Sequence, residues 1–198
     1  MKKLRFIAYC FISMVLVAMD TSAVEPRFEG HVVVEWLQHD GDDRLVRLVE
    51  PFAFVDKQKK VWSVPKGAVV DGASIPRVLW TLVGPPFVGD YRYASVVHDY
   101  YCDTKSESWR ATHRMFLEAS LLGGVESEKA KVMYAAVYAR GPRWESVTTI
   151  GLEGPETLTY EVDVPIISDK QLDEISNYIY ENDPSLEEIE SRIDNPRP

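Results

Sequence analysis

His98 and Asp99 are neighbours near the end of a segment, residues 90–102, whose pattern predicts a helix. An imidazole in such a position can act as a general base, and a carboxylate beside it can hold a divalent metal ion such as calcium. Successive helical residues point about 100° apart, so Asp99 is expected to face the Asp71–Pro76 turn. A second interpretation stays open, in which His98 hydrogen-bonds a buried carbonyl and Asp99 fixes the turn by accepting backbone N–H bonds.

His113 lies on the next predicted helix, residues 108–122, and is a third candidate for a catalytic role. Its neighbours at spacings of three and four include Trp109 and Phe116, so its side chain is expected to face inward. The short loop between the two helices favours an antiparallel pair. That arrangement would bring His98 and His113 to the same depth and create a polar cluster between the helices.

Five further residues around the helix are candidates for binding. Asp71 is either a turn residue or a site carboxylate, and Ser74 in the same turn lacks the G-x-S-x-G context of a nucleophile. Arg77 and Arg92 can bind an anionic group such as a phosphate, or pair with the many carboxylates of the chain. Tyr101 belongs to an aromatic set that either lines a pocket for lipid or sugar or packs in the core.

Cysteine content leaves the chain without an internal disulfide once an N-terminal leader is removed, because Cys10 leaves with it and Cys102 remains alone. A single buried thiol is expected to act as a small apolar side chain. A zinc site that adds His31 and His39 to the other two histidines is not favoured, because the spacing matches no standard arrangement.

The elements that must position these residues are short strands followed by helices. β-branched runs separated by polar, turn-forming clusters predict two hairpins and one further short strand, at residues 30–36, 44–48, 52–55, 61–64 and 68–70. Capping serines and terminal glycines then predict three packed helices, at residues 90–102, 108–122 and 128–140. We therefore expect an α+β fold in which a small antiparallel β-sheet precedes the helices.

Both ends of the chain differ in composition from its centre. Residues 1–23 combine a basic start, a short apolar stretch and small residues near the end, the pattern of a cleaved signal peptide. Residues 24–144 are expected to form a single α+β domain. Residues 145–198 are expected to form an acidic C-terminal extension, with a short strand, a helix that begins at a capping box of Ser168 and Gln171, and a short acidic helix. The protein is expected to be exported, periplasmic or secreted, with no transmembrane segment after cleavage.

The charge of the chain limits its partners. It carries 22 basic and 31 acidic residues, a net charge of −9. Signal cleavage would remove three basic residues and one acidic residue, which takes the net charge to about −11. An acidic protein is repelled by a phosphate backbone. Nucleic acid is therefore excluded as a partner, and an envelope lipid or protein remains.

A set of motifs between residues 28 and 144 resembles an uncharacterised domain family of short phage and bacterial proteins. The motifs include W-x-V-P-x-G from Trp62, D-G-A-S-I-P-R from Asp71, and H-D-Y in the predicted helix. The resemblance implies a shared fold and no particular activity. The family usually carries an aspartate three residues before a phenylalanine on the following helix, and this chain departs from that pattern with His113 before Phe116.

The arrangement is also similar to that of the secreted phospholipases A2, in which a His-Asp pair on one helix faces an aspartate on an antiparallel helix. That resemblance implies that His98 activates water, that Asp99 binds calcium and that position 113 orients His98. An imidazole at position 113 can still accept a hydrogen bond, although it does not orient a basic histidine as a carboxylate does. The flanking cysteines and glycine-rich calcium loop of that family are absent from this sequence.

Two classes of function follow from these expectations. In the first, the protein is a metal-assisted hydrolase of a cell-envelope substrate, lipid or similar, with His98 as the base. In the second, it is a non-enzymatic envelope or phage-derived interaction module in which the His-Asp pair is structural. Replacing His98 by alanine separates the two. An enzyme would lose activity at little cost in stability, whereas a structural pair would lose about 1–3 kcal/mol of stability.

Overall fold

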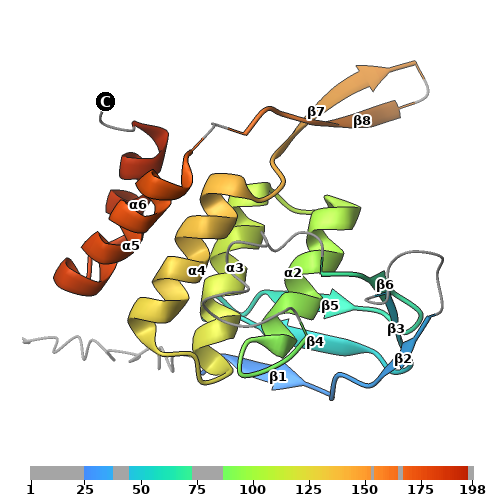
Figure 1. Cartoon of the computed structure of the whole chain (residues 1–198). Coiled ribbons are helices and arrows are strands. Elements are labelled where there is room, and N and C mark those ends of the chain that lie inside the picture. Colours follow the sequence, from blue (N-terminus) through green and yellow to red (C-terminus); the bar gives the residue numbers. More distant parts are fainter. Residues whose placement is uncertain (1–24, 38–44, 73–86, 153, 165–166, 196–198) are drawn as a thin grey trace, which may run out of the picture.

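The computed structural model describes residues 25–37, 45–72, 87–152, 154–164 and 167–195. The α+β class is confirmed, because small antiparallel sheets come first in the chain and helices follow (Figure 1). Three helices pack side by side, a long hairpin follows them, and two further helices lie beyond the hairpin. The candidate functional residues lie mainly on the first two of these helices.

The six N-terminal strands form two three-stranded antiparallel sheets, where the sequence suggested one. One sheet has the order β1-β4-β5, formed by Arg27–Glu29, Phe52–Val55 and Val61–Val64. The other has the order β2-β3-β6, formed by Val34–Trp36, Val46–Leu48 and Val69–Val70. Both expected hairpins, β2–β3 and β4–β5, are present, and each gains a third strand.

Gly30 lies between β1, which the sequence does not predict, and β2, which is the last part of the strand expected at 30–36. The sequence predicts a single strand at 30–36, but Gly30 has a φ of 83°, in the left-handed region that favours glycine. A Cβ atom at this position would lie 3.0 Å from the carbonyl oxygen of Pro51. The chain bends here, so that it pairs with β4 up to Glu29 and with β3 from Val34 onward.

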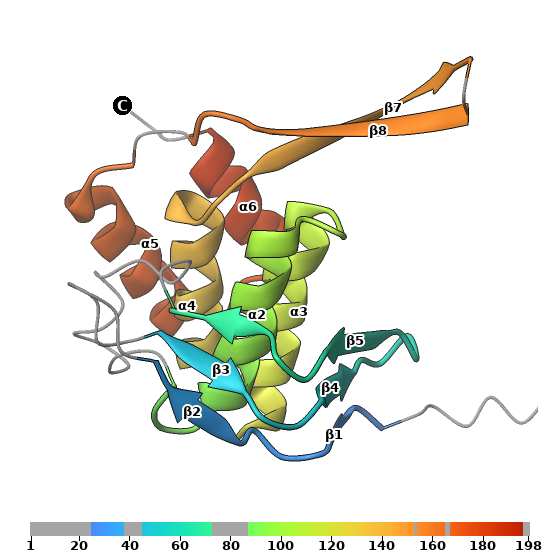
Figure 2. The ribbon, with the colours of Figure 1, turned by 90° about the vertical axis from the view of Figure 1, so that its right-hand side faces the viewer.

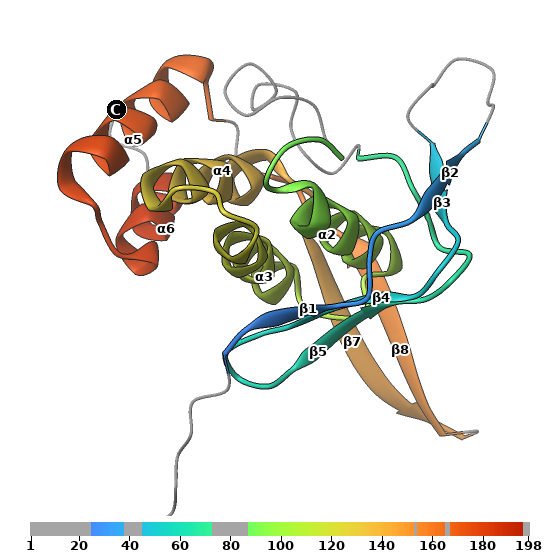
Figure 3. The same cartoon turned by 90° about the horizontal axis from the view of Figure 1, so that it is seen from below.

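Helices α2, α3 and α4 lie close to their predicted positions and form a layer on the sheets (Figure 3). They span Arg92–Thr104, Trp109–Leu122 and Ser127–Arg140. The Ser108 hydroxyl caps α3 by accepting a hydrogen bond from the backbone N–H of Ala111, as expected. Helix α4 differs slightly, because its N-cap is Glu126 and Ser127 is already helical. Helix α2 contacts β5, β6 and α3, so it joins both sheets to the helical layer.

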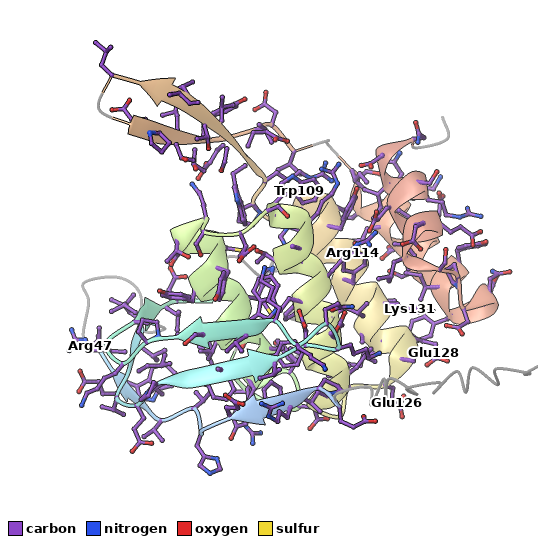
Figure 4. All side chains as sticks on the ribbon, turned by 180° about the vertical axis from the view of Figure 1, so that it is seen from behind. Arg47, Trp109, Arg114, Glu126, Glu128 and Lys131 are labelled. Atoms are coloured by element: carbon purple, nitrogen blue, oxygen red, sulfur yellow. The ribbon has the colours of Figure 1, made fainter. Side chains whose placement is uncertain are left out.

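A hairpin that the sequence predicts only in part projects from one end of the helical layer (Figures 1 and 2). Its strands are β7, Trp144–Gly151, and β8, Gly154–Glu161. The sequence indicates a strand near β8, whereas its partner β7 is not foreseen. Trp144 fixes the base of the hairpin, since it is buried and its indole N–H donates to the carbonyl of Glu107 at 2.8 Å. Trp109 lies near the same end of the helical layer (Figure 4).

Two C-terminal helices, α5 (Asp169–Asn182) and α6 (Leu186–Asp194), pack on α4. The expected capping box is present at the start of α5, where Ser168 and Gln171 bond reciprocally. Both helices contribute fully buried isoleucines to the same core as the other helices, namely Ile179, Ile189 and Ile193. The segment expected to form an acidic extension thus supplies nearly all of the hairpin and two packed helices.

Polar contacts also hold the C-terminal helices in place. Arg114 of α3 and Lys131 of α4 lie on the side of the layer that faces these helices (Figure 4). Arg114 pairs with Glu190 at 2.7 Å and Lys131 with Asp183 at 2.5 Å.

Within the described residues, no helix is long and apolar enough to cross a bilayer.

Candidate functional site: a buried His-Cys-His cluster

The two histidines expected to meet between α2 and α3 do so. Nε2 of His98 lies 2.8 Å from Nδ1 of His113, which is a hydrogen-bond distance. Both side chains are fully buried. Lys105 ends α2 in the left-handed conformation, with a φ of 51°, and the chain turns back there into α3. The short connection therefore places the two rings at the same depth.

Burial keeps both imidazoles neutral. Desolvation lowers the pKa of His98 from its ordinary 6.5 to about 3. The pKa of His113 is also lowered well below its ordinary value, first by burial and then by electrostatic interaction with His98 and Arg143. The ring of His98 lies 4.8 Å from that of Phe116, and the ring of His113 lies 5.6 Å from that of Trp109. Between two neutral rings, one N–H donates and the facing nitrogen accepts.

Cys102 joins the histidines to form a cluster of three possible metal ligands. Its Sγ lies 3.6 Å from Nε2 of His98, and one ligand atom from each of His98, Cys102 and His113 lies within 4.8 Å of the others. Cys102 is expected from the sequence to act as a small apolar side chain, but its place four residues after His98 puts both side chains on one helical face. Of the other histidines, His31 is exposed and His39 lies outside the described residues.

Asp99 faces the segment that follows β6, as the sequence predicts. Its Oδ2 accepts hydrogen bonds from the backbone N–H groups of Asp71, at 2.8 Å, and Gly72, at 2.9 Å. Gly72 has a φ of 70°, a conformation that favours glycine. These bonds are the ones expected if Asp99 fixes the loop. Asp99 is not part of the three-donor cluster, and its role as a calcium ligand stays a prediction.

A third carboxylate lies close enough to Asp99 to be affected by its charge. The pKa of Asp103 is raised to about 6, first by partial burial and then by the negative charges of Asp99 and Asp71. The side chain of Asp103 still reaches solvent, so water screens part of this repulsion. The ionised form of Asp103 is therefore slightly unfavourable for the folded state, in contrast to Asp99, which accepts two backbone hydrogen bonds.

Tyr101 lies toward the sheet and not toward the histidines. Its hydroxyl accepts a hydrogen bond from the backbone N–H of Ser63 at 3.0 Å, and its ring packs edge-on against Trp62 with a centroid distance of 4.9 Å. Desolvation is the largest cause that raises its pKa. Of the two roles left open for Tyr101, the structure places it in the core, where it joins α2 to β5.

The remaining candidates are not brought to the cluster by any described contact. Arg92 is exposed, donates to the carbonyl of Gly89 at 3.2 Å, and lies over the ring of Tyr93. Its predicted role in binding an anion stays a prediction. Ser74 and Arg77 lie outside the described residues.

The fold and the cluster define a class: an α+β protein whose two sheets carry a helical layer with a buried His-Cys-His group. Residues 46–137, which run from β3 into α4 and include the cluster, match the model of a family described as "Protein of unknown function (DUF1353)". The expected resemblance to an uncharacterised domain family is thereby confirmed.

Two curated relatives come from Sinorhizobium fredii (strain NBRC 101917 / NGR234). "Uncharacterized protein y4jT" is 46% identical over 112 residues, which cover 56% of this chain and 33% of that protein. "Uncharacterized protein y4iH" is 43% identical over 104 residues, which cover 52% of this chain and 44% of that protein. The chain thus spans less than half the length of either relative. No solved structure matches this chain.

Proposed function

We propose that this chain is an exported, non-enzymatic module that binds a protein partner through its β7–β8 hairpin, while the His98–Asp99 pair serves the fold. The observation that carries the proposal is the hairpin itself. Its two strands, each of eight residues, stand out from the body with nearly all of their side chains exposed or half-buried (Figure 2). A long, exposed strand pair is a surface that proteins usually cover or protect.

The hairpin has a free outer edge on each strand. Among the described strands, β7 pairs only with β8, so each presents a row of backbone N–H and C=O groups. A two-stranded hairpin is at best marginally stable alone in water. A partner that adds an extended strand to one edge would satisfy these backbone groups and stabilise the hairpin.

One face of the hairpin, named the apolar face, carries three exposed apolar side chains beside Glu145, Thr149 and Glu156. The register pairs Val147 with Leu158 and Glu145 with Tyr160, so Val147, Leu158 and Tyr160 share a face, and all three are exposed. The opposite face carries two hydroxyl pairs, Ser146–Thr159 at 2.8 Å and Thr148–Thr157 at 2.9 Å. A group of exposed apolar side chains on a projecting element supports a docking role.

The charge of the hairpin favours a particular kind of partner. Residues 144–161 contain four glutamates and no lysine or arginine. A strand with basic and apolar side chains would complement this surface. An anionic lipid surface would repel it. We therefore assign the hairpin to a protein partner and not to a membrane.

The geometry of the His-Asp pair supports a structural role. His98 is fully buried, contacts His113, and has a pKa far below the value near ambient pH that suits a general base. Asp99 is occupied by two backbone N–H groups. Export rests on the sequence of residues 1–23, which has the pattern of a signal peptide.

Metal-assisted hydrolysis of an envelope substrate is the second candidate, and one observation favours it. Two imidazoles and one thiol converge between α2 and α3. Zinc held by three protein ligands keeps a fourth position for water or substrate. Hydrolysis would then require the cluster, whereas the binding function proposed here requires the hairpin.

Photo-cross-linking in the envelope of producing cells tests the proposal. A photoreactive phenylalanine analogue replaces Leu158 on the apolar face or, in a matched chain, Thr157 on the hydroxyl face. We expect the probe at position 158 to join one defined protein and the probe at position 157 to give far less adduct. The purified partner should bind more weakly as salt rises, because salt screens the attraction between acidic and basic strands. Adducts that are equal at both positions, confined to lipid, or absent would overturn the proposal.

A further inference from the structure

The buried cluster between α2 and α3 has no part in the binding function of the hairpin. We propose that His98, Cys102 and His113 bind one Zn²⁺ ion. This inference goes beyond the proposed function and does not depend on it, because no residue of the hairpin takes part.

Two of the three distances between donor atoms lie near the edges of a zinc coordination tetrahedron. With Zn–N bonds of about 2.0 Å and Zn–S bonds of about 2.3 Å, two nitrogens lie about 3.3 Å apart, and a nitrogen and a sulfur about 3.5 Å apart. Here the two nitrogens are 2.8 Å apart, and Sγ of Cys102 is 3.6 Å from Nε2 of His98. The third distance, from Sγ to the His113 ring nitrogen, is within 4.8 Å. Small side-chain rotations would therefore bring all three donor atoms to bonding distance from one ion.

Rigid elements hold the three ligands. His98 and Cys102 are one turn apart on α2, a spacing at which two side chains on one helical face can share a metal ion. His113 comes from α3, which packs directly against α2. All three side chains are buried. Ligands on packed helices are held more firmly than ligands on loops. The three side chains would therefore lose little conformational entropy when the ion binds.

The donor set selects the metal. Imidazole nitrogen and thiolate sulfur suit zinc, whereas calcium and magnesium require oxygen ligands. Copper also accepts two imidazoles and a thiolate, but its electron-transfer sites require a trigonal arrangement with a weak axial ligand. Zinc has no geometric preference of this kind. It therefore tolerates better the unequal distances between these three donors.

The surroundings of His113 match those of a metal ligand. When Nδ1 binds the metal, Nε2 carries the proton and needs an acceptor. Nε2 is buried and lacks a hydrogen bond of regular geometry, yet the backbone carbonyl of Pro142 interacts with the ring. Gly141 lets the backbone approach this closely, since a Cβ atom there would lie 3.2 Å from Nε2. The Pro142 carbonyl would thus orient the ring.

Zinc would connect the two helices that form the centre of the fold. Binding converts the thiol of Cys102 to a thiolate, with release of one proton, and the neutral imidazoles of His98 and His113 each donate a lone pair. The ion would replace the hydrogen bond between the two rings by bonds that cross from α2 to α3. The folded state alone brings the three donors together, so zinc should stabilise it.

The test uses the full chain carrying Cys10→Ser, in which Cys102 is the remaining thiol. Zinc content is measured after dialysis, and Co²⁺ is then exchanged in as a spectroscopic probe. We expect one zinc ion per chain, and a cobalt form with tetrahedral ligand-field bands and a sulfur-to-cobalt charge-transfer band. Cys102→Ser should remove the charge-transfer band, and His113→Asn should weaken zinc binding roughly tenfold or more. His31→Asn, at an exposed histidine, is the matched control and should change neither.

Three results would overturn the inference. The first is a chain that retains neither zinc nor cobalt. The second is bound cobalt without a charge-transfer band in the Cys10→Ser chain, a result that needs no further variant to fold. The third is a purified copper form that zinc cannot displace, which would contradict the choice of metal. Loss of partner binding in hairpin variants with zinc retained would leave this inference intact, so its failure can be distinguished from failure of the proposed function.

Discussion

At the scale of single residues, the contact between His98 and His113 determines what the site can do. Both rings are fully buried, hydrogen-bonded to each other, and held neutral by desolvation. A general base is most effective when its pKa lies near the ambient pH. The pair is therefore better suited to packing, hydrogen bonding and metal binding than to proton abstraction.

Stability of the metal-free protein should fall in acid because of this pair. The folded-state pKa of His98 is about 3, below the value of about 6.5 expected in the unfolded chain. The unfolded chain therefore takes up protons first. The contribution to stability is complete above about pH 6.5 and is lost toward pH 3, at up to about 1.4 kcal/mol per pH unit for each buried histidine. Urea unfolding in chelator between pH 7 and pH 4 measures this slope.

A matched pair of variants assigns the slope to the cluster. His113→Asn keeps a hydrogen-bonding group near the position of Nδ1 but removes a side chain that titrates. It thereby also removes the imidazole whose pKa Arg143 lowers. It should lower the slope below pH 6. His31→Asn, at an exposed position, should leave the slope unchanged. Equal slopes in wild type and His113→Asn would show that this histidine does not titrate as described.

At the scale of elements, α2 is the helix that joins the parts of the body. Asp99 attaches it to the segment after β6, Tyr101 to β5, and His98 to α3. These contacts leave α2 on different sides because consecutive helical residues point in different directions. His98, Asp99 and Tyr101 therefore each have a structural role that joins α2 to a neighbouring element.

Asp99→Asn should destabilise the protein by about 1.5–3 kcal/mol, as expected for loss of hydrogen bonds to a charged acceptor. Both N–H groups of Asp71 and Gly72 donate to Oδ2, so the asparagine carbonyl oxygen can accept them, but the acceptor loses its negative charge and the two hydrogen bonds become weaker. The matched control is Asp103→Asn, four residues along α2. Because the ionised form of Asp103 is unfavourable, this change should be neutral or slightly stabilising above pH 6. Urea unfolding at pH 7 compares them, and equal losses would contradict the anchoring role of Asp99.

The sequence predicts local features of this fold better than contacts between distant segments. Caps at Ser108 and Ser168 and the meeting of His98 with His113 follow from short-range patterns, and all are present. The division of the strands into two sheets depends on the approach of Gly30 to Pro51, which composition does not reveal.

Two further features escape the sequence for similar reasons. Strand β7 is missed because its exposed residues lack the alternation of a half-buried strand. The role of Cys102 is missed because an isolated thiol usually acts as an apolar side chain, and only the neighbouring helix supplies the third donor.

At the scale of the whole molecule, the hairpin and the last two helices lie outside the residues that match the family model. The family match covers residues 46–137, whereas the β7–β8 hairpin and helices α5 and α6 lie beyond it. The two C-terminal helices are packed onto α4 and extend the core. The hairpin instead remains exposed (Figure 1). We therefore propose that the cluster stabilises the helical layer and that the hairpin binds the partner.

The most direct test of this division is the affinity of the cross-linked partner for two double variants of the hairpin. Val147→Ser with Leu158→Ser removes the two aliphatic side chains of the apolar face. Thr148→Ser with Thr157→Ser alters the opposite face while keeping its hydroxyls. We predict that the first variant binds the partner at least about tenfold more weakly, which is a loss of at least about 1.4 kcal/mol of binding free energy. The second variant should bind like wild type. Equal affinity of both variants and wild type would contradict the assignment of the binding function to the hairpin.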